Sequence, residues 1–327
     1  MITIILYHSM AFWLPNGWFC QMPVEASWII GTIAKWLNSF HVYGFVLVSG
    51  YIFYALKYEN GRYQEFLPFL RNKFCRLIVP YIFTSVVWVI PIYLFFYNAG
   101  LTSIVSKYAL AESPSQLWFL VMLFDVFAIF WPISDLSRTH SCTGAFLVSV
   151  LYIIGLVGAR LFPNVFQIWT ALSFVIFFYL GFVLRKTGID YLMKVPAAVY
   201  LSADIVLFVL QILFDAQGDP ISRFLSFVTK QLLHLFGALS SFVVLEKFAL
   251  RYGTRKPPFE FCKKHSMVLY LFHQQIIYFA ISVGNGRIPN IVLIAANFLV
   301  AFFGASVIAV FTSQFRLTRF LTTGRTK

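Results

Sequence analysis

One histidine of this 327-residue chain, His8, stands inside the hydrophobic run that opens it. Apolar side chains precede it from Ile4, and Ala11–Leu14 follow it closely. A histidine in such surroundings has to be neutral, hydrogen-bonded or used in chemistry. Because imidazole titrates near neutrality, His8 is a candidate general base, with a buried structural histidine as the alternative.

Other ionisable side chains also interrupt long hydrophobic runs. They are His41, Asp125, Asp204, Lys230, His234 and His273. In a membrane each costs several kcal/mol unless it is paired or faces a cavity, so each marks a candidate site.

A helical rise of about 1.5 Å per residue gives the depth of each group in the membrane. Asp204 and His234 lie at similar depths, about 17 and 15 Å from the outer face, on consecutive antiparallel segments. We therefore expect them to form a pair, either to pin two helices together or to relay a proton. Asp125, about 12 Å from the outside, has no evident partner in the sequence and is a candidate for lining a cavity.

Two cations near the other face, Lys73 and Arg76, are spaced i, i+3 and would share one face of an α-helix. Arginine binds phosphate oxygens in a bidentate fashion and lysine adds a point charge. The pair is a candidate phosphate site, and positive charge that only fixes topology is the alternative.

Composition shows which elements must position these residues. Hydrophobic residues make up 60% of the chain and charged residues only 11%, whereas a soluble domain carries about 25% charge. Apolar segments long enough to cross a bilayer recur along the whole length. We expect an all-α, polytopic transmembrane bundle forming one membrane domain over residues 1–327, with about ten spans. The predicted spans are Met1–Leu14 (short), Phe40–Leu56, Leu77–Tyr97, Leu117–Ser134, Gly144–Phe162, Phe166–Leu184, Val195–Phe214, Phe224–Leu245, Ser266–Gly284 and Asn290–Phe311.

The net charge of +13 is distributed unevenly between the two sets of loops. One set and the tail hold most of the Lys and Arg, which is the positive-inside pattern and predicts that both termini are cytoplasmic. The placement indicates a lipid bilayer as partner and no nucleic acid. Cys20, Cys75, Cys142 and Cys262 are far apart and form no CxxC pair, so neither a metal site nor a disulfide framework is expected.

Five stretches in order carry a family resemblance. They are "IILYHS" (4–9), "FHVYGFVLVSGYIF" (40–53), "FLRNKFCRLIVPYIF" (69–83), "LWFLVMLF" (117–124) and "SMVLYLFHQQ" (266–275). Together they resemble the acyltransferase family 3 membrane proteins, bacterial enzymes that O-acylate, usually O-acetylate, cell-surface carbohydrates. The chain departs from the family pattern at Tyr43, Lys73 and Gln116, which stand where proline, arginine and histidine are usual. The usual arginine eleven positions before the first-helix histidine would precede Met1, so the N-terminus is predicted to be truncated, and an inactive remnant is a further alternative.

The resemblance implies an inner-membrane O-acyltransferase, most simply an O-acetyltransferase. It would move an acyl group from cytoplasmic acetyl-CoA to a polysaccharide or its lipid-linked precursor, with no permanently bound cofactor and no metal. His8 would be the catalytic base, and Lys73 and Arg76 would bind the coenzyme. His41 is a candidate for binding the carbohydrate acceptor or assisting proton transfer. Trp118 is most simply an interface anchor, with stacking on the sugar as the alternative. His273 would line the thioester path or have a structural role. A polysaccharide or acyl-unit exporter of the same fold is the alternative function.

Overall fold

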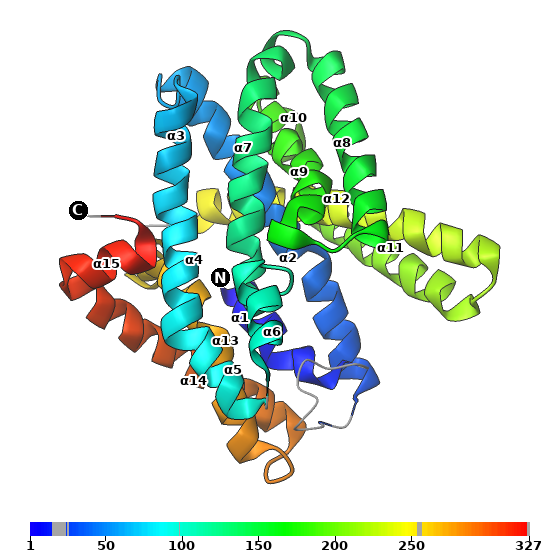
Figure 1. Cartoon of the computed structure of the whole chain (residues 1–327). Coiled ribbons are helices and arrows are strands. Elements are labelled where there is room, and N and C mark those ends of the chain that lie inside the picture. Colours follow the sequence, from blue (N-terminus) through cyan, green and yellow to red (C-terminus); the bar gives the residue numbers. More distant parts are fainter. Residues whose placement is uncertain (15–23, 25, 98, 254–256, 326–327) are drawn as a thin grey trace. The chain divides into compact units, whose positions relative to one another are not determined.

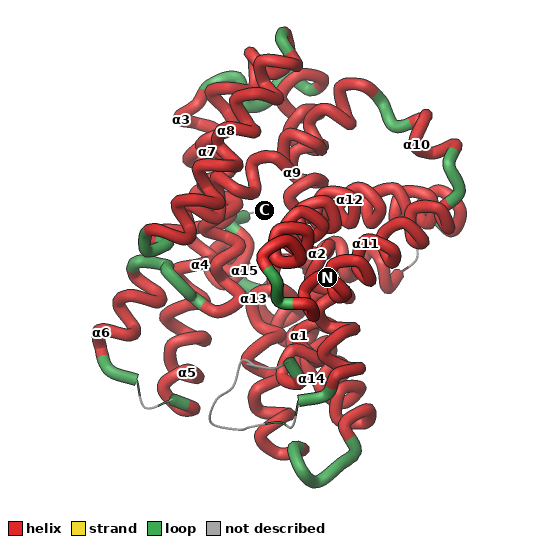
Figure 2. Tube along the Cα trace, turned by 90° about the vertical axis from the view of Figure 1, so that its right-hand side faces the viewer, coloured by secondary structure: helices red, strands yellow, loops and turns green. Residues whose placement is uncertain are grey.

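A computed structural model describes residues 1–14, 24, 26–97, 99–253 and 257–325, and every regular element in these ranges is a helix (Figures 1 and 2). In this part of the chain nine helical segments are long and apolar enough to cross a membrane, and Ile2–Trp13 is a shorter apolar helix. The expected all-α bundle of about ten spans is confirmed. Helices are favoured because each satisfies its own backbone hydrogen bonds in lipid.

The described chain divides into two compact units. Unit 1 comprises Met1–Ala34, Tyr63–Val175 and Pro257–Lys327, and unit 2 comprises Lys35–Arg62 and Ile176–Lys256.

Unit 1 contains most of the helices. They are α1 (Ile2–Met10), the 3₁₀ turn η1 (Ala11–Trp13), the first part of α2 (Trp28–Tyr54), α3 (Phe66–Lys73), the π-helical turn η3 (Phe74–Ile78), α4 (Val79–Thr84), the π-helical turn η4 (Ser85–Val89), α5 (Ile90–Phe96), α6 (Leu101–Ile104), the π-helical turn η5 (Val105–Ala109), the 3₁₀ turn η6 (Ser115–Leu117), α7 (Trp118–Thr139), α8 (Ser141–Leu161), the 3₁₀ turn η7 (Val165–Gln167), the first part of α9 (Ile168–Thr187), α13 (Pro257–Gly284), α14 (Asn290–Gln314) and α15 (Arg316–Thr323).

Within unit 1, α1 packs against α13 and α14. Their contact is apolar and includes the fully buried Ile5, Trp13, Ile277 and Ala301. The short first helix is therefore covered by protein along this side, which is how a polar residue such as His8 can be kept away from lipid.

The run from α3 to α5 contains two π-helical turns, and each comes just before a proline. Pro80 lacks the N–H that would bond the carbonyl of Arg76, and Pro91 lacks the one for Val87. In the wider turns the N–H of Val79 donates to the carbonyl oxygen of Phe74, and the N–H of Ile90 donates to that of Ser85. Arg76 lies inside the first of these turns, a kind of irregularity that is frequent at functional sites.

The last helix, α15, follows α14 after a break at Phe315 and packs against α4, α13 and α14. It ends at Gly324, which has the left-handed φ of 65°. Glycine adopts this conformation without steric cost.

Unit 2 contains the second part of α2 and of α9 together with the helices that follow. These are the π-helical turn η2 (Ala55–Glu59), α10 (Asp190–Lys194), α11 (Ala197–Gln217) and α12 (Pro220–Tyr252). Glycines allow close helix contact here: a Cβ on Gly50 would lie 2.8 Å from the carbonyl carbon of Phe178, and one on Gly181 would lie 2.7 Å from that of Leu47. Small residues have this role in membrane helix packing.

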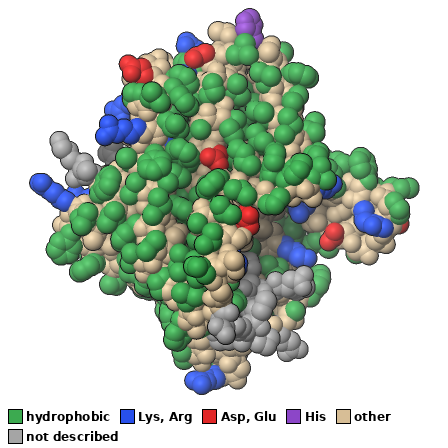
Figure 3. Space-filling model, viewed as in Figure 1, with side chains coloured by type: hydrophobic (Ala, Val, Ile, Leu, Met, Phe, Trp, Pro, Cys, Tyr) green, Lys and Arg blue, Asp and Glu red, His purple; other side chains and the backbone are tan. Residues whose placement is uncertain are grey.

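Much of the visible surface is hydrophobic (Figure 3). Large apolar side chains such as Phe146, Ile291 and Val307 are more than half exposed to the surroundings. A water-soluble protein rarely exposes apolar patches of this extent, and lipid is the medium that such a surface fits.

Candidate functional site

The most direct contact between predicted site residues joins His8 on α1 to His273 on α13. Nδ1 of His8 lies 2.6 Å from Nε2 of His273. The ring planes differ by only 11°, with centroids 4.8 Å apart. Because two nitrogens this close cannot belong to rings stacked face to face, the imidazoles meet edge to edge, as an N–H···N hydrogen bond requires.

The partners of His273 fix the positions of the protons on both rings. Its Nδ1 lies 3.0 Å from the carbonyl oxygen of Leu269 and 2.8 Å from that of Tyr270. Carbonyl oxygens only accept, so Nδ1 of His273 carries a hydrogen, and in the neutral ring Nε2 then carries the lone pair. His8 therefore donates through Nδ1–H, and its own lone pair lies on Nε2.

Both rings lie inside the protein: His8 is 7% exposed and His273 is fully buried. The oriented Nε2 of His8 is suited to accept a proton, because a hydrogen bond at the other nitrogen holds the tautomer and the ring plane. The same logic orients the histidine of a serine-protease triad, with a carboxylate in place of the second imidazole.

A second polar cluster, which the sequence did not predict, lies beside this pair on α13. The side-chain amides of Gln116 and Gln275 bond each other in both directions, at 2.7 and 2.9 Å. Gln116 also donates to the carbonyl of Leu271 at 2.9 Å, and the hydroxyl of Tyr270 donates to the carbonyl of Gln116. Two features of the sequence could have indicated this cluster. Gln116 stands before "LWF", where the family often has histidine, and Gln275 ends the "HQQ" sequence.

Three buried polar atoms on η1, α13 and α14 lack a hydrogen-bond partner among the described residues. They are Oε1 of Gln274, Oδ1 of Asn297 and Nε1 of Trp13. Asn297 also donates weakly to the carbonyl of Ser9, 3.4 Å away. Unsatisfied groups of this kind need an explanation, and hydroxyl groups of a bound molecule would satisfy them.

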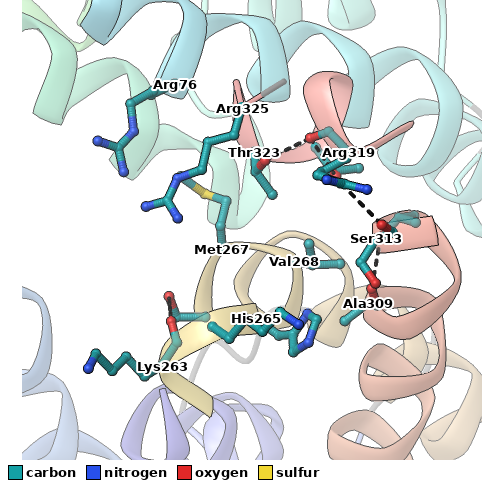
Figure 4. A pocket seen from close by; sticks show the side chains of 14 residues that line it. Arg76, Lys263, His265, Met267, Val268, Ala309, Ser313, Arg319, Thr323 and Arg325 are labelled. Carbon is teal, nitrogen blue, oxygen red and sulfur yellow. Dashed lines mark hydrogen bonds between the residues drawn. The ribbon is translucent and has the colours of Figure 1, made fainter. Parts of the chain in front are cut away.

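A basic pocket of about 380 Å³ lies at the start of α13. It is lined by Arg76 of η3, by α13, by the end of α14 and by the C-terminal segment Arg316–Arg325, and Figure 4 shows the labelled side chains around it. The cationic lining residues are Arg76, Lys263, Lys264, Arg319 and Arg325, with His265 beside them. No Asp or Glu lines it in the described chain.

Lys73 does not line this pocket, which corrects the expectation that Lys73 and Arg76 form one site. Lys73 is 8% exposed, and its Nζ lies 3.7 Å from the ring centroid of Phe127 and 4.9 Å from that of Tyr63. These cation–π contacts compensate for its burial. The π-helical turn that begins at Phe74 lies between the two residues and has more residues per turn than an α-helix. A spacing of three therefore leaves Lys73 and Arg76 further apart around the helix axis than the expected shared face requires.

Helix α13 links the basic pocket to the histidine pair. His265 lines the pocket, and His273 is eight residues further along the same helix. At about 1.5 Å per residue the two positions are about 12 Å apart along the axis. His8 and His273 are not among the residues that line the pocket, so this axial distance describes the spacing of two separate sites on one helix.

The predicted Asp204–His234 pair is wrong. Oδ2 of Asp204 accepts from Nε1 of Trp36 at 2.9 Å. His234 instead stacks on Tyr43, with centroids 4.1 Å apart and planes 20° apart. Equal depth was the basis of the prediction, and depth does not specify which way a side chain faces around its helix.

The remaining candidates make the following contacts within their own units. His41, in unit 2, bonds the carbonyl of Leu37 through Nδ1 at 2.6 Å. Trp118 packs edge-on against Phe174 at 5.9 Å. Asp125 is partly buried on α7, and its Oδ2 has no hydrogen-bond partner in the described chain.

The described residues contain no group of three or more His, Cys, Asp or Glu that could hold a metal ion. Cys75, Cys142 and Cys262 are free thiols, and Cys20 lies outside the described residues.

Comparison with known proteins supplies one match. Residues 1–313 match the family model Acyl_transf_3, described as an acyltransferase domain. No curated protein and no solved structure matches the chain. The matched region contains the paired histidines, Arg76 and, up to Ser313, the nine long apolar helices of the described residues. This multi-pass membrane protein therefore belongs to the acyltransferase 3 family.

Proposed function

We propose that this acyltransferase moves a short acyl group, most simply acetyl, from acyl-CoA to a hydroxyl of a cell-surface polysaccharide or of its lipid-linked precursor. The observation that carries the proposal is the buried contact between His8 and His273, which presents an oriented imidazole lone pair in a chain of this family. In a bacterium the enzyme would lie in the inner membrane, with the basic pocket facing the cytoplasm, where acyl-CoA is made.

His8 acts as the general base in the proposed reaction. Its Nε2 takes the proton of the acceptor hydroxyl as that oxygen attacks the thioester carbonyl. The tetrahedral intermediate collapses by breaking the carbon–sulfur bond, which forms the ester, and His8 returns the proton to the departing sulfur. No proton is gained or lost overall.

His273 orients the base and supports its charge. When His8 becomes positively charged, its Nδ1–H bond to Nε2 of His273 strengthens, because hydrogen bonds from charged donors are stronger. His273 in turn is held by the carbonyls of Leu269 and Tyr270. The chain of hydrogen bonds from His8 through His273 to these carbonyls would stabilise the positive charge on His8, as a buried carboxylate does in other enzymes.

The basic pocket supports a phosphorylated donor. Its five Lys and Arg residues suit the three phosphate groups of coenzyme A, and arginine matches phosphate geometry in particular. The buried amide oxygens of Gln274 and Asn297 support an acceptor rich in hydroxyls, which would donate to them.

The test uses purified full-length protein and radiolabelled acetyl-CoA. The acceptor is polysaccharide, or its lipid-linked precursor, extracted from a strain that lacks the gene and therefore lacks the modification. We expect alkali-labile label on the saccharide, and His8→Ala should lower the rate by about 10²–10⁴-fold.

His140→Ala is the matched control, since His140 is exposed between α7 and α8 and touches neither site. Wild-type turnover in His8→Ala would contradict the proposed base. Saccharide transport without ester formation by the wild-type protein would favour the exporter instead.

A further inference from the structure

The C-terminal segment Arg316–Arg325 supplies part of the basic pocket although it lies beyond the matched family region. That region ends at residue 313. After it, Arg319, Thr322, Thr323 and Arg325 all line the cavity. The segment is therefore a component of the pocket that membership of the family does not assign.

Gly324 holds Arg325 beside Arg76. With its left-handed φ of 65° it approaches the π-helical turn so closely that an added Cβ would lie 2.6 Å from the Cα of Arg76. The same Cβ would also overlap the carbonyl of Cys75. Figure 4 shows the two guanidinium groups, one from each segment, extending into the same space.

Arg319 is fixed on another wall by a bond to the helix before it. Its Nε donates to the carbonyl oxygen of Ser313 at 3.1 Å. That carbonyl belongs to the last turn of α14, where carbonyls lack helical partners. One donor of the guanidinium thus anchors the side chain, and the terminal amino groups stay available to a ligand (Figure 4).

The positive charge of the pocket is only partly compensated by acidic side chains. None of the described lining residues is acidic. Glu260 of α13 pairs with Lys263 at 3.7 Å and shares an adjoining cavity with Lys264 and Arg325, which leaves one carboxylate beside five Lys and Arg side chains. Like charges held together by the backbone are unfavourable in the absence of an anion, so the pocket is built for an anionic ligand.

We propose that Arg325, together with Arg76, binds a phosphate group of the nucleotide portion of the acyl-CoA donor, and that Arg319 binds a second phosphate. The inference rests on the proposed function and deepens it by assigning donor recognition to the C-terminal segment. The pocket recognises the coenzyme and is indifferent to the acyl group, whose place is further along α13.

The first measurement is the dissociation constant of coenzyme A for full-length protein in nanodiscs of phosphatidylcholine, by calorimetry. Arg325→Ala should weaken binding about tenfold or more, because a charge-assisted bond to phosphate is lost. Arg325→Lys should recover part of the affinity, since the charge remains without the fork. In turnover assays the KM for acetyl-CoA should rise with kcat unchanged, as expected for uniform binding.

Arg316→Ala is the matched control. Arg316 begins the same helix, is exposed and does not line the pocket, so its loss removes the same charge at a neighbouring place. Equal dissociation constants for Arg325→Ala and Arg316→Ala would overturn the proposal. Failure of the wild-type protein to bind coenzyme A would overturn the proposed donor itself, which separates the two failures.

Anionic lipid headgroups share the phosphate chemistry and are distinguished by repeating the titration with phosphatidylglycerol in the nanodiscs. General repulsion of the coenzyme by anionic lipid weakens binding equally in wild type and Arg325→Ala, and the proposal expects this parallel behaviour. If the lipid weakens binding only where Arg325 is present, then the arginine binds headgroups and the proposal is overturned.

Discussion

At the scale of single residues, the site depends on a contact between two histidines that are 265 positions apart in the chain. The sequence predicted both as site residues, because each interrupts a hydrophobic segment. It did not predict their contact, since nothing in a linear pattern specifies that α1 packs against α13. Under the proposed function, the contact gives His273 the role of orienting the base instead of lining a path.

This role predicts how substitutions of His273 behave. His273→Ala removes the acceptor for Nδ1–H of His8 and should lower kcat by about 10²-fold or more, with the KM for acetyl-CoA unchanged. In His273→Gln an amide oxygen takes the place of the accepting nitrogen and should restore a substantial part of kcat. Steady-state kinetics with radiolabelled acetyl-CoA measures both.

Equal activity of the Ala and Gln variants would contradict an orienting hydrogen bond. Size-exclusion profiles of the two proteins control for folding, because either substitution alters a fully buried position.

At the scale of the elements, the sequence predicted the helices well and their irregularities poorly. Hydropathy and length determine the spans, because lipid leaves the backbone little alternative. The π-helical turn at Phe74–Ile78 depends on how Pro80 is accommodated, and the spacing of Lys73 and Arg76 did not reveal it. Asp204 likewise bonds Trp36, since the facing of a helix is decided by packing.

Close helix approach in unit 2 predicts a large effect of one methyl group. Gly181→Ala would place a Cβ 2.7 Å from the carbonyl carbon of Leu47, so α2 and α9 must separate. We expect a loss of several kcal/mol of stability or failure to accumulate, because overpacking forces backbone shifts. Thermal unfolding in detergent, followed by fluorescence, measures the change.

Gly100→Ala is the comparison, since a Cβ there would meet only the hydroxyl of Thr102 at 4.0 Å and its φ is −77°. Unfolding temperatures that agree for the two variants would contradict close contact between α2 and α9.

At the scale of the whole molecule, the distribution of charge predicts orientation. Most Lys and Arg lie in one set of loops and in the tail, and the basic pocket uses part of this charge. The same cations can therefore serve topology and ligand binding. Sequence patterns could not separate these uses, because only the fold gathers Arg76, Lys264 and Arg325 around one cavity.

A C-terminal fusion tests this orientation. Green fluorescent protein attached after Lys327 should be fluorescent in cells, and alkaline phosphatase at the same place should be inactive, because both report a cytoplasmic end. The opposite result would put the pocket on the side where no acyl-CoA is made, and the proposed donor would then be untenable.

Gly324 brings the short C-terminal segment Arg316–Arg325 against the turn that holds Arg76, and this contact makes the segment part of the basic pocket. A protease or an early stop codon that ends the chain just after Ser313 would leave the nine long apolar helices of the described residues nearly complete, but would remove the guanidinium groups of Arg319 and Arg325 from the cavity. If Arg319 and Arg325 bind the donor as proposed, the shortened enzyme would have a higher KM for acyl-CoA, and it would also lose the packing of α15 against α4, α13 and α14. Under the proposal, loss of the end of the chain would therefore weaken binding of the donor without slowing the chemical step.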